Sequence, residues 1–240
     1  MQLDQRTVKR ETSSVWLYGS AARGDSDELS DLDVLAVGAD REIDEEFRAH
    51  LHNFGIGQSA LSRYTWAEIE GMSGYGSLFL QHLKSEGRPI VEGQHVRGRL
   101  NNILRKLGPY TRARQDLRAF RMGLMEAKQS LLTGGSLPFE LSVLATIVRH
   151  SCILGCCVMG EPRFGRTEPV RVVADQWHLP PEVPRDYQQL YRYRLLADNR
   201  ISQVIPELTD KEAIEWCRRV DGLLRRLEVE VERYCSEVSC

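Results

Sequence analysis

Two carboxylates stand one residue apart in a largely apolar run near the N-terminus, in SDLDVLAVG from Ser30 to Gly38. Successive residues of a strand point to opposite faces of a sheet, so Asp31 and Asp33 are expected to project from the same face. Two negative charges this close repel each other, and a divalent cation between them would remove that cost. Mg²⁺ typically takes one or two protein carboxylates together with substrate phosphates. The pair therefore predicts a metal site.

A second feature precedes the aspartates, in the sequence VWLYGSAARG from Val15 to Gly24. The first four residues predict a strand, and Gly19 and Ser20 predict a tight turn after it. Glycine allows the backbone to approach a ligand closely, and a serine hydroxyl with the amides that follow can hold an anion. Arg23 adds a positive charge nearby. A Gly–Ser pair alone is an ordinary turn, but its place before the paired aspartates predicts a phosphate-binding turn.

The stretch GSAARGDSDELSDLDVLAV resembles the signature of the DNA polymerase β-like nucleotidyltransferase superfamily, particularly its minimal and antibiotic-type bacterial members. The resemblance covers roughly residues 12–93. It implies that Gly19 and Ser20 bind the triphosphate of a nucleotide, and the positive charge of Arg23 makes that residue a weaker candidate for the same role. It also implies that Asp31 and Asp33 are the catalytic residues and hold Mg²⁺ or Mn²⁺. In such a site the metal aligns the α-phosphate for in-line attack by an acceptor hydroxyl, and pyrophosphate leaves.

One part of the family pattern is missing from the sequence. Active members usually carry a third carboxylate on the next core strand, which is expected here in GQSALSRYT, residues 57–65, where there is no Asp or Glu. Ala60 or Ser62 would take the position. The nearest acid, Glu68, belongs to a capping box that begins at Thr65 and is expected to fold back onto its own helix. The sequence leaves open a slower enzyme, an enzyme completed by a partner or substrate, or a nucleotide-binding domain without catalysis.

The two halves of the chain differ in pattern. Up to residue 93 the pattern alternates, with strands expected at 15–18, 32–37, 58–64 and 88–91 and helices at 40–53, 65–71 and 76–86. After it, helices are expected at 94–132, 138–159, 168–178, 185–199 and 210–236. We therefore expect an α+β protein. Residues 1–93 form a nucleotidyltransferase-like mixed sheet with flanking helices, and residues 94–240 form an all-α helical bundle.

Composition limits the setting of the protein. The net charge is −2, and the polar N-terminus lacks the apolar core of a secretory signal. No apolar run is expected to reach the roughly 18–20 residues of a membrane span, so no membrane association is expected. Six cysteines in 240 residues do not indicate a disulfide scaffold. Cys152, Cys156 and Cys157 are expected in a core helix. These features predict a cytoplasmic protein with free thiols.

A basic segment lies at the start of the helical half. Residues 97–132 contain nine Lys or Arg residues and two acids. A solvated helix face explains such a segment, and so would contact with nucleotide phosphates, with an RNA acceptor or with an acidic partner. The sequence leaves these alternatives open.

Together these features favour an Mg²⁺-dependent nucleotidyltransferase. It would move a nucleoside monophosphate from an NTP, ATP being the first candidate, to a hydroxyl of a protein, an RNA or a small molecule. The alternative is a catalytically impaired nucleotide-binding or interaction module, such as one half of a toxin–antitoxin or phage-defence pair. In either case the helical half is a candidate surface for a protein partner or for homo-oligomerisation.

Overall fold

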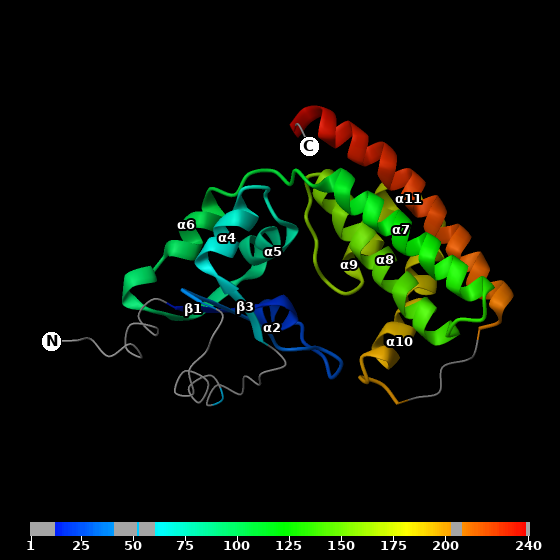
Figure 1. Cartoon of the computed structure of the whole chain (residues 1–240), viewed down its shortest axis with the longest axis horizontal. Helices are drawn as coiled ribbons and strands as arrows, with labels where there is room; N and C mark the ends of the chain where they lie inside the picture. The colour runs from blue at the N-terminus through cyan, green and yellow to red at the C-terminus, as the bar shows by residue number, and fades with distance from the viewer. Residues whose placement is uncertain (1–12, 41–51, 53–60, 203–207, 239–240) are drawn as a thin grey trace. The chain divides into compact units, whose positions relative to one another are not determined.

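The computed structural model describes residues 13–40, 52, 61–202 and 208–238 (Figure 1). Four strands form one mixed sheet in the order β3-β2-β1-β4. They are β1 (Ser14–Tyr18), β2 (Asp33–Gly38), β3 (Leu61–Thr65) and β4 (Arg88–Glu92). β1 is antiparallel to both of its neighbours, and β2 is parallel to β3. This arrangement confirms the predicted α+β class. The helix expected at 40–53 lies almost entirely outside the described residues.

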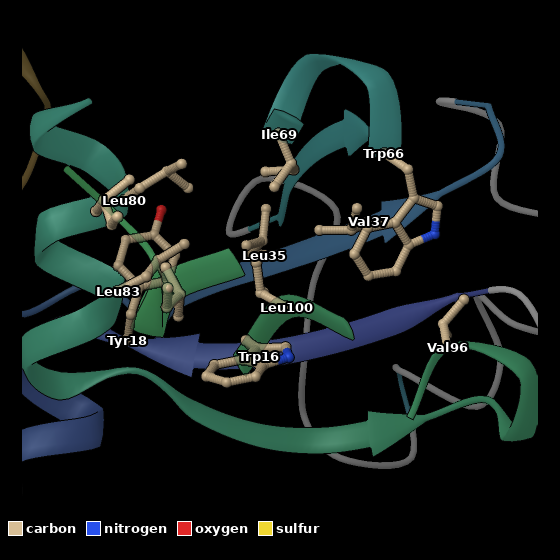
Figure 2. Close-up of a cluster of buried hydrophobic side chains, with 12 residues drawn as sticks. Trp16, Tyr18, Leu35, Val37, Trp66, Ile69, Leu80, Leu83, Val96 and Leu100 are labelled. Carbon is tan, nitrogen blue, oxygen red and sulfur yellow. The ribbon is translucent and has the colours of Figure 1, made fainter. Parts of the chain in front are cut away.

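Three helices pack on one face of this sheet: α4 (Trp66–Ser73), α5 (Leu78–Glu86) and α6 (Arg99–Arg105). Figure 2 shows the buried side chains between the helices and the strands. Alternate residues of the two central strands supply the sheet side of this core, namely Trp16, Tyr18, Leu35 and Val37. Because side chains alternate along a strand, Asp33 has the same orientation as Leu35 and Val37. An acidic residue therefore begins a strand face that is otherwise apolar.

Helix α4 begins where the capping box predicts. The backbone N–H of Glu68 donates to Thr65 Oγ1 at 3.2 Å, and the backbone N–H of Thr65 donates to Glu68 Oε2 at 2.8 Å. Both bonds satisfy amides that the first turn of a helix would otherwise leave without a partner. Glu68 is therefore engaged with its own helix, as expected.

The chain divides between Tyr110 and Thr111 into two compact units. The second unit consists of the helices α7 (Ala113–Leu132), α8 (Leu137–Val158), α9 (Glu168–Gln176), α10 (Val183–Ala197) and α11 (Asp210–Val238). Helix α8 packs against all four of the others. The predicted all-helical second half is present in this unit.

The single helix predicted for residues 94–132 is wrong. The structure has a short 3₁₀ helix η2 (Gln94–Val96), then α6, then an irregular segment before α7 begins at Ala113. Gly98 precedes α6 in a left-handed conformation, and Pro109 interrupts the helical hydrogen bonds because it has no N–H and disfavours a helical residue before it. Helix α6 packs against α4 and α5, so it lies in the first compact unit. The functional boundary at 93/94 stays a prediction.

Helix α8 corrects the expectation that no segment has the length and composition of a membrane span. An 18-residue window within Leu137–Val158 has a mean hydropathy of 1.8, but 78% of that window is buried inside the protein. This burial is typical of the central helix of a bundle. The thiols of Cys152 and Cys156 lie in this helix, and burial raises the pKa of both, that of Cys156 to about 12. Both thiols are therefore protonated at neutral pH.

Part of the basic segment is used between helices. Arg114 of α7 donates two hydrogen bonds to the carboxylate of Glu232 in α11, at 3.0 Å from Nε and 2.7 Å from Nη2. Arg121 donates to Glu228 of the same helix at 2.7 Å. These exposed pairs add little stability but explain two of the nine cations without a nucleic acid.

Removing the cap of α4 tests whether local chemistry sets the start of this helix. We expect Thr65→Ala to lower the free energy of unfolding by about 1 kcal/mol, because the backbone N–H of Glu68 loses its acceptor. Ser73→Ala is the matched control, since it removes an exposed hydroxyl at the other end of α4 and is expected to change stability by less than about 0.5 kcal/mol. The stability of both variants is measured by urea unfolding followed by tryptophan fluorescence. Trp16 and Trp66 lie in the first unit and report on its unfolding. Equal losses for the two variants would contradict the assignment.

Candidate functional site

The Gly19–Ser20 turn lies directly against the carboxylate of Asp33. Strand β1 ends at Tyr18, and the single-turn helix α2 (Gly19–Arg23) follows at once. Gly19 has a φ of +71°, and a Cβ added to it would lie 2.2 Å from Asp33 Oδ2. Only glycine meets both conditions, because a side chain there would be strained and would also overlap the carboxylate. The predicted phosphate-binding turn and the predicted metal ligand are thus in contact.

Strand pairing explains this contact. In the antiparallel ladder between β1 and β2, Tyr18 pairs with Asp33. The residue that follows Tyr18 therefore emerges beside the Asp33 side chain. Asp31 precedes the strand by two residues and is exposed, whereas Asp33 and Ser20 are partly buried. The structure brings the Gly19–Ser20 turn beside Asp33 at the start of β2, and Asp31 lies two residues before that strand.

The donor set fits a hard divalent cation. Asp31 and Asp33 offer carboxylate oxygens, and the missing side chain of Gly19 lets the backbone of the turn come close to the carboxylate of Asp33. Mg²⁺ commonly uses one or two carboxylates and completes its shell with phosphate oxygens and water. Within the described ranges no group of three His, Cys, Asp or Glu side chains is arranged to hold a metal. A cation held by Asp31 and Asp33 would therefore need further oxygen ligands from a bound ligand or water.

Two hydroxyls, one from each of the strands β1 and β3 that flank β2, lie close together. Ser62 of β3 is paired with Leu35 of β2, and its Oγ lies 3.3 Å from the hydroxyl of Tyr18. Burial raises the pKa of Tyr18, the hydrogen bond with Ser62 lowers it, and the charge of Asp33 raises it, with a net increase above 10.0. Tyr18 is therefore neutral at physiological pH. Of the two positions considered for a third carboxylate, Ser62 is engaged with Tyr18, and Ala60 lies outside the described residues.

Arg23 lies at the end of α2, where it forms two ion pairs. Its Nη1 is 2.6 Å from Glu86 Oε2, and its Nε is 3.2 Å from Asp25 Oδ2. Burial lowers the pKa of Arg23, but the hydrogen bonds to Glu86 and Asp25 outweigh it, so that the net shift is upward. The phosphate-binding role expected for Arg23 stays a prediction, and in the structure its guanidinium is bound to these carboxylates.

Sequence reasoning missed Glu86, which contacts His82. Both belong to α5, four residues apart, and the imidazole of His82 contacts Glu86 Oε1. The ring of His82 also meets that of Tyr18 edge-on, with centroids 5.4 Å apart. The spacing of the two residues indicates a shared helix face, but no local pattern connects Glu86 with Arg23, which is 63 residues away in sequence.

A comparison with protein families agrees with this geometry. Residues 3–66 match the family described as nucleotidyltransferase domain. The matched segment contains the Gly19–Ser20 turn, both aspartates and all of β3. It confirms the resemblance of this part of the chain to the nucleotidyltransferases, and it supports transfer of a nucleoside monophosphate as the general activity. No curated protein matches the chain at a significant level.

Two glycine substitutions separate backbone strain from contact with Asp33. Gly19 and Gly24 both have positive φ, +71° and +83°, but nothing lies within 4 Å of a Cβ at Gly24. We expect Gly24→Ala to cost about 1–2 kcal/mol of stability from strain alone and to leave nucleotide binding unchanged. Gly19→Ala carries the same strain and also pushes the Asp33 carboxylate aside, so metal-dependent NTP affinity is expected to fall at least about tenfold. Thermal unfolding and NTP titrations of both variants measure the two effects. Equal NTP affinities would show that the contact with Asp33 does not matter.

Proposed function

We propose that the protein is an Mg²⁺-dependent nucleotidyltransferase, which moves a nucleoside monophosphate from an NTP, with ATP the first candidate, to an acceptor hydroxyl. The contact between Gly19 and Asp33 is the observation that supports it most directly. It puts a turn suited to phosphates beside a carboxylate suited to the metal of a bound nucleotide. The family match of residues 3–66 supports the same class of reaction.

Each group at the site has a role in this proposal. Asp31 and Asp33 hold Mg²⁺ or Mn²⁺, and the backbone and hydroxyl of Gly19 and Ser20 receive the triphosphate. The metal, when bound, neutralises charge on the phosphates and orients the α-phosphate. The acceptor oxygen forms a bond to the α-phosphorus while the bond to the bridging oxygen breaks, and pyrophosphate leaves. The protein contributes by positioning these groups and by compensating their charge.

The sheet supplies no general base among its described residues near Asp33. Tyr18 is neutral, Ser62 is a hydroxyl, and Glu68 caps α4. In the proposed reaction Asp31 or Asp33, the acceptor itself or a partner therefore accepts the proton of the attacking hydroxyl. The acceptor is a protein, an RNA or a small molecule.

The hydroxyl of Ser62 on β3 favours a second candidate function, a nucleotide-binding module without catalysis. Ser62 already uses its hydroxyl with Tyr18 where active relatives are expected to place a carboxylate. Such a module would bind an NTP at the same turn and act through a partner protein. The two candidates share the metal and nucleotide site and differ in whether label is transferred.

The transfer assay uses each α-³²P-labelled NTP with Mg²⁺ or Mn²⁺ and cell lysate. We expect wild-type protein to label a protein, RNA or small-molecule band, and Asp31→Asn with Asp33→Asn to reduce this labelling to background. The double variant is expected to fold normally, and relief of charge repulsion would stabilise the metal-free protein. Glu28→Gln, which removes an exposed carboxylate from the loop between the two motifs, is the control and is expected to keep wild-type labelling.

The outcomes distinguish the two candidates. Labelling by the double aspartate variant at the wild-type rate would contradict the metal assignment. No labelling with any NTP, together with metal-dependent NTP binding in a thermal-shift assay, would favour the binding module.

A further inference from the structure

A largely buried carboxylate lies beside the candidate site without a part in the proposed transfer. It belongs to Glu86, the last residue of α5, whose side chain is only 10% exposed. Its Oε2 accepts a hydrogen bond of 2.6 Å from Nη1 of Arg23. Arg23 ends α2, the same short helix that begins with Gly19, and α2 packs against α5. The ion pair therefore connects the far end of the Gly–Ser turn to a helix of the core.

Glu86 is also connected to the beginning of α2. Its other oxygen contacts the imidazole of His82, and the ring of His82 packs edge-on against Tyr18. Tyr18 immediately precedes Gly19 and pairs with Asp33 in the sheet. One carboxylate thus reaches both ends of α2, directly through Arg23 and indirectly through His82.

We propose that Glu86 is a positioning residue of the nucleotide site, which holds Arg23 and so fixes the Gly19–Ser20 turn against Asp33 before the NTP binds. This inference rests on the proposed function, because it assigns the triphosphate to that turn. A turn that is already ordered loses less conformational freedom when the ligand arrives, and the difference appears as tighter binding. A partly buried charged pair suits this role because solvent and salt screen it less than a fully exposed pair.

A different role for Glu86 makes the opposite prediction. If Glu86 competed with the triphosphate for Arg23, its removal would free the guanidinium and strengthen NTP binding. A positioning role predicts weaker binding after the same change. The direction of the effect therefore decides between the two roles.

The test is Glu86→Gln, which keeps the size of the side chain and removes its charge. We expect Kd and KM for the NTP to rise about tenfold, while kcat changes little because Asp31 and Asp33 remain in place. Glu86→Asp is expected to restore part of the affinity. Unchanged or tighter NTP binding, or a loss of thermal stability with no change in KM, would overturn the inference.

The structure offers a matched control in the same unit. Arg99 and Glu70 form an ion pair of 2.7 Å between α6 and α4, and neither lies on α2 or α5. Glu70→Gln removes one carboxylate from an Arg–Glu pair in the same way and is expected to leave NTP affinity unchanged. An equal loss of affinity in this control would show a general electrostatic effect and reject the positioning role.

A double variant tests whether Glu86 acts through Arg23. If it does, Arg23→Gln with Glu86→Gln is expected to bind NTP no more weakly than Arg23→Gln alone, since the tether is already lost. Fully additive losses would contradict the proposed route.

The wild-type titration separates failure of this inference from failure of the proposed function. Wild-type protein that binds no NTP would overturn both. Wild-type binding that depends on Asp31 and Asp33 but not on Glu86 would overturn only the positioning role.

Discussion

The close approach of the Gly19 backbone to the carboxylate of Asp33 is the constraint on which the candidate site depends. It follows from antiparallel pairing, because Tyr18 pairs with Asp33 and the next residue must turn beside that side chain. A Cβ at this point would lie 2.2 Å from the carboxylate, so the turn is possible only with glycine. A group suited to phosphates and a group suited to a metal are therefore brought together by the sheet itself.

The position of Asp33 at the start of β2 explains how an acid is tolerated on a buried face. Farther along the strand, the side chains with the same orientation, Leu35 and Val37, lie in the core beneath the helices (Figure 2). Asp33 is partly exposed at the open end, where its charge keeps contact with solvent. The neighbouring groups, Tyr18 and Ser62, are neutral hydroxyls, so they add no like charge to the two aspartates.

Burial and ion pairing also explain two features of the helical unit whose role the sequence alone leaves open, the apolar helix α8 and the basic residues of α7. Helix α8 has the hydropathy of a membrane span, but four other helices of the unit cover it. Helix α7 contains part of the basic segment 97–132, but its Arg114 and Arg121 are paired with acids of α11. In both cases the hydropathy or charge of one helix is explained by the helices that pack against it.

Features set by residues close together in the chain could be predicted well. The capping box of Thr65 and Glu68, the four strands and the Gly–Ser turn followed by paired aspartates each depend on neighbouring residues, and the resemblance to nucleotidyltransferases follows from them. The continuous helix expected over 94–132 was wrong, because Gly98 and the Gly108–Pro109 pair interrupt a segment whose other residues favour a helix.

The sequence by itself determined which chemical groups are candidates for the site, because the Gly–Ser turn and the Asp31–Asp33 pair are local motifs. Only the tertiary structure decided how these groups are supported. The ion pair between Arg23 and Glu86 joins residues 63 positions apart, and it exists because α2 packs against α5 beside the end of β1. A short motif encodes its own backbone geometry, whereas a contact between distant segments depends on the packing of the whole core, which no single segment specifies.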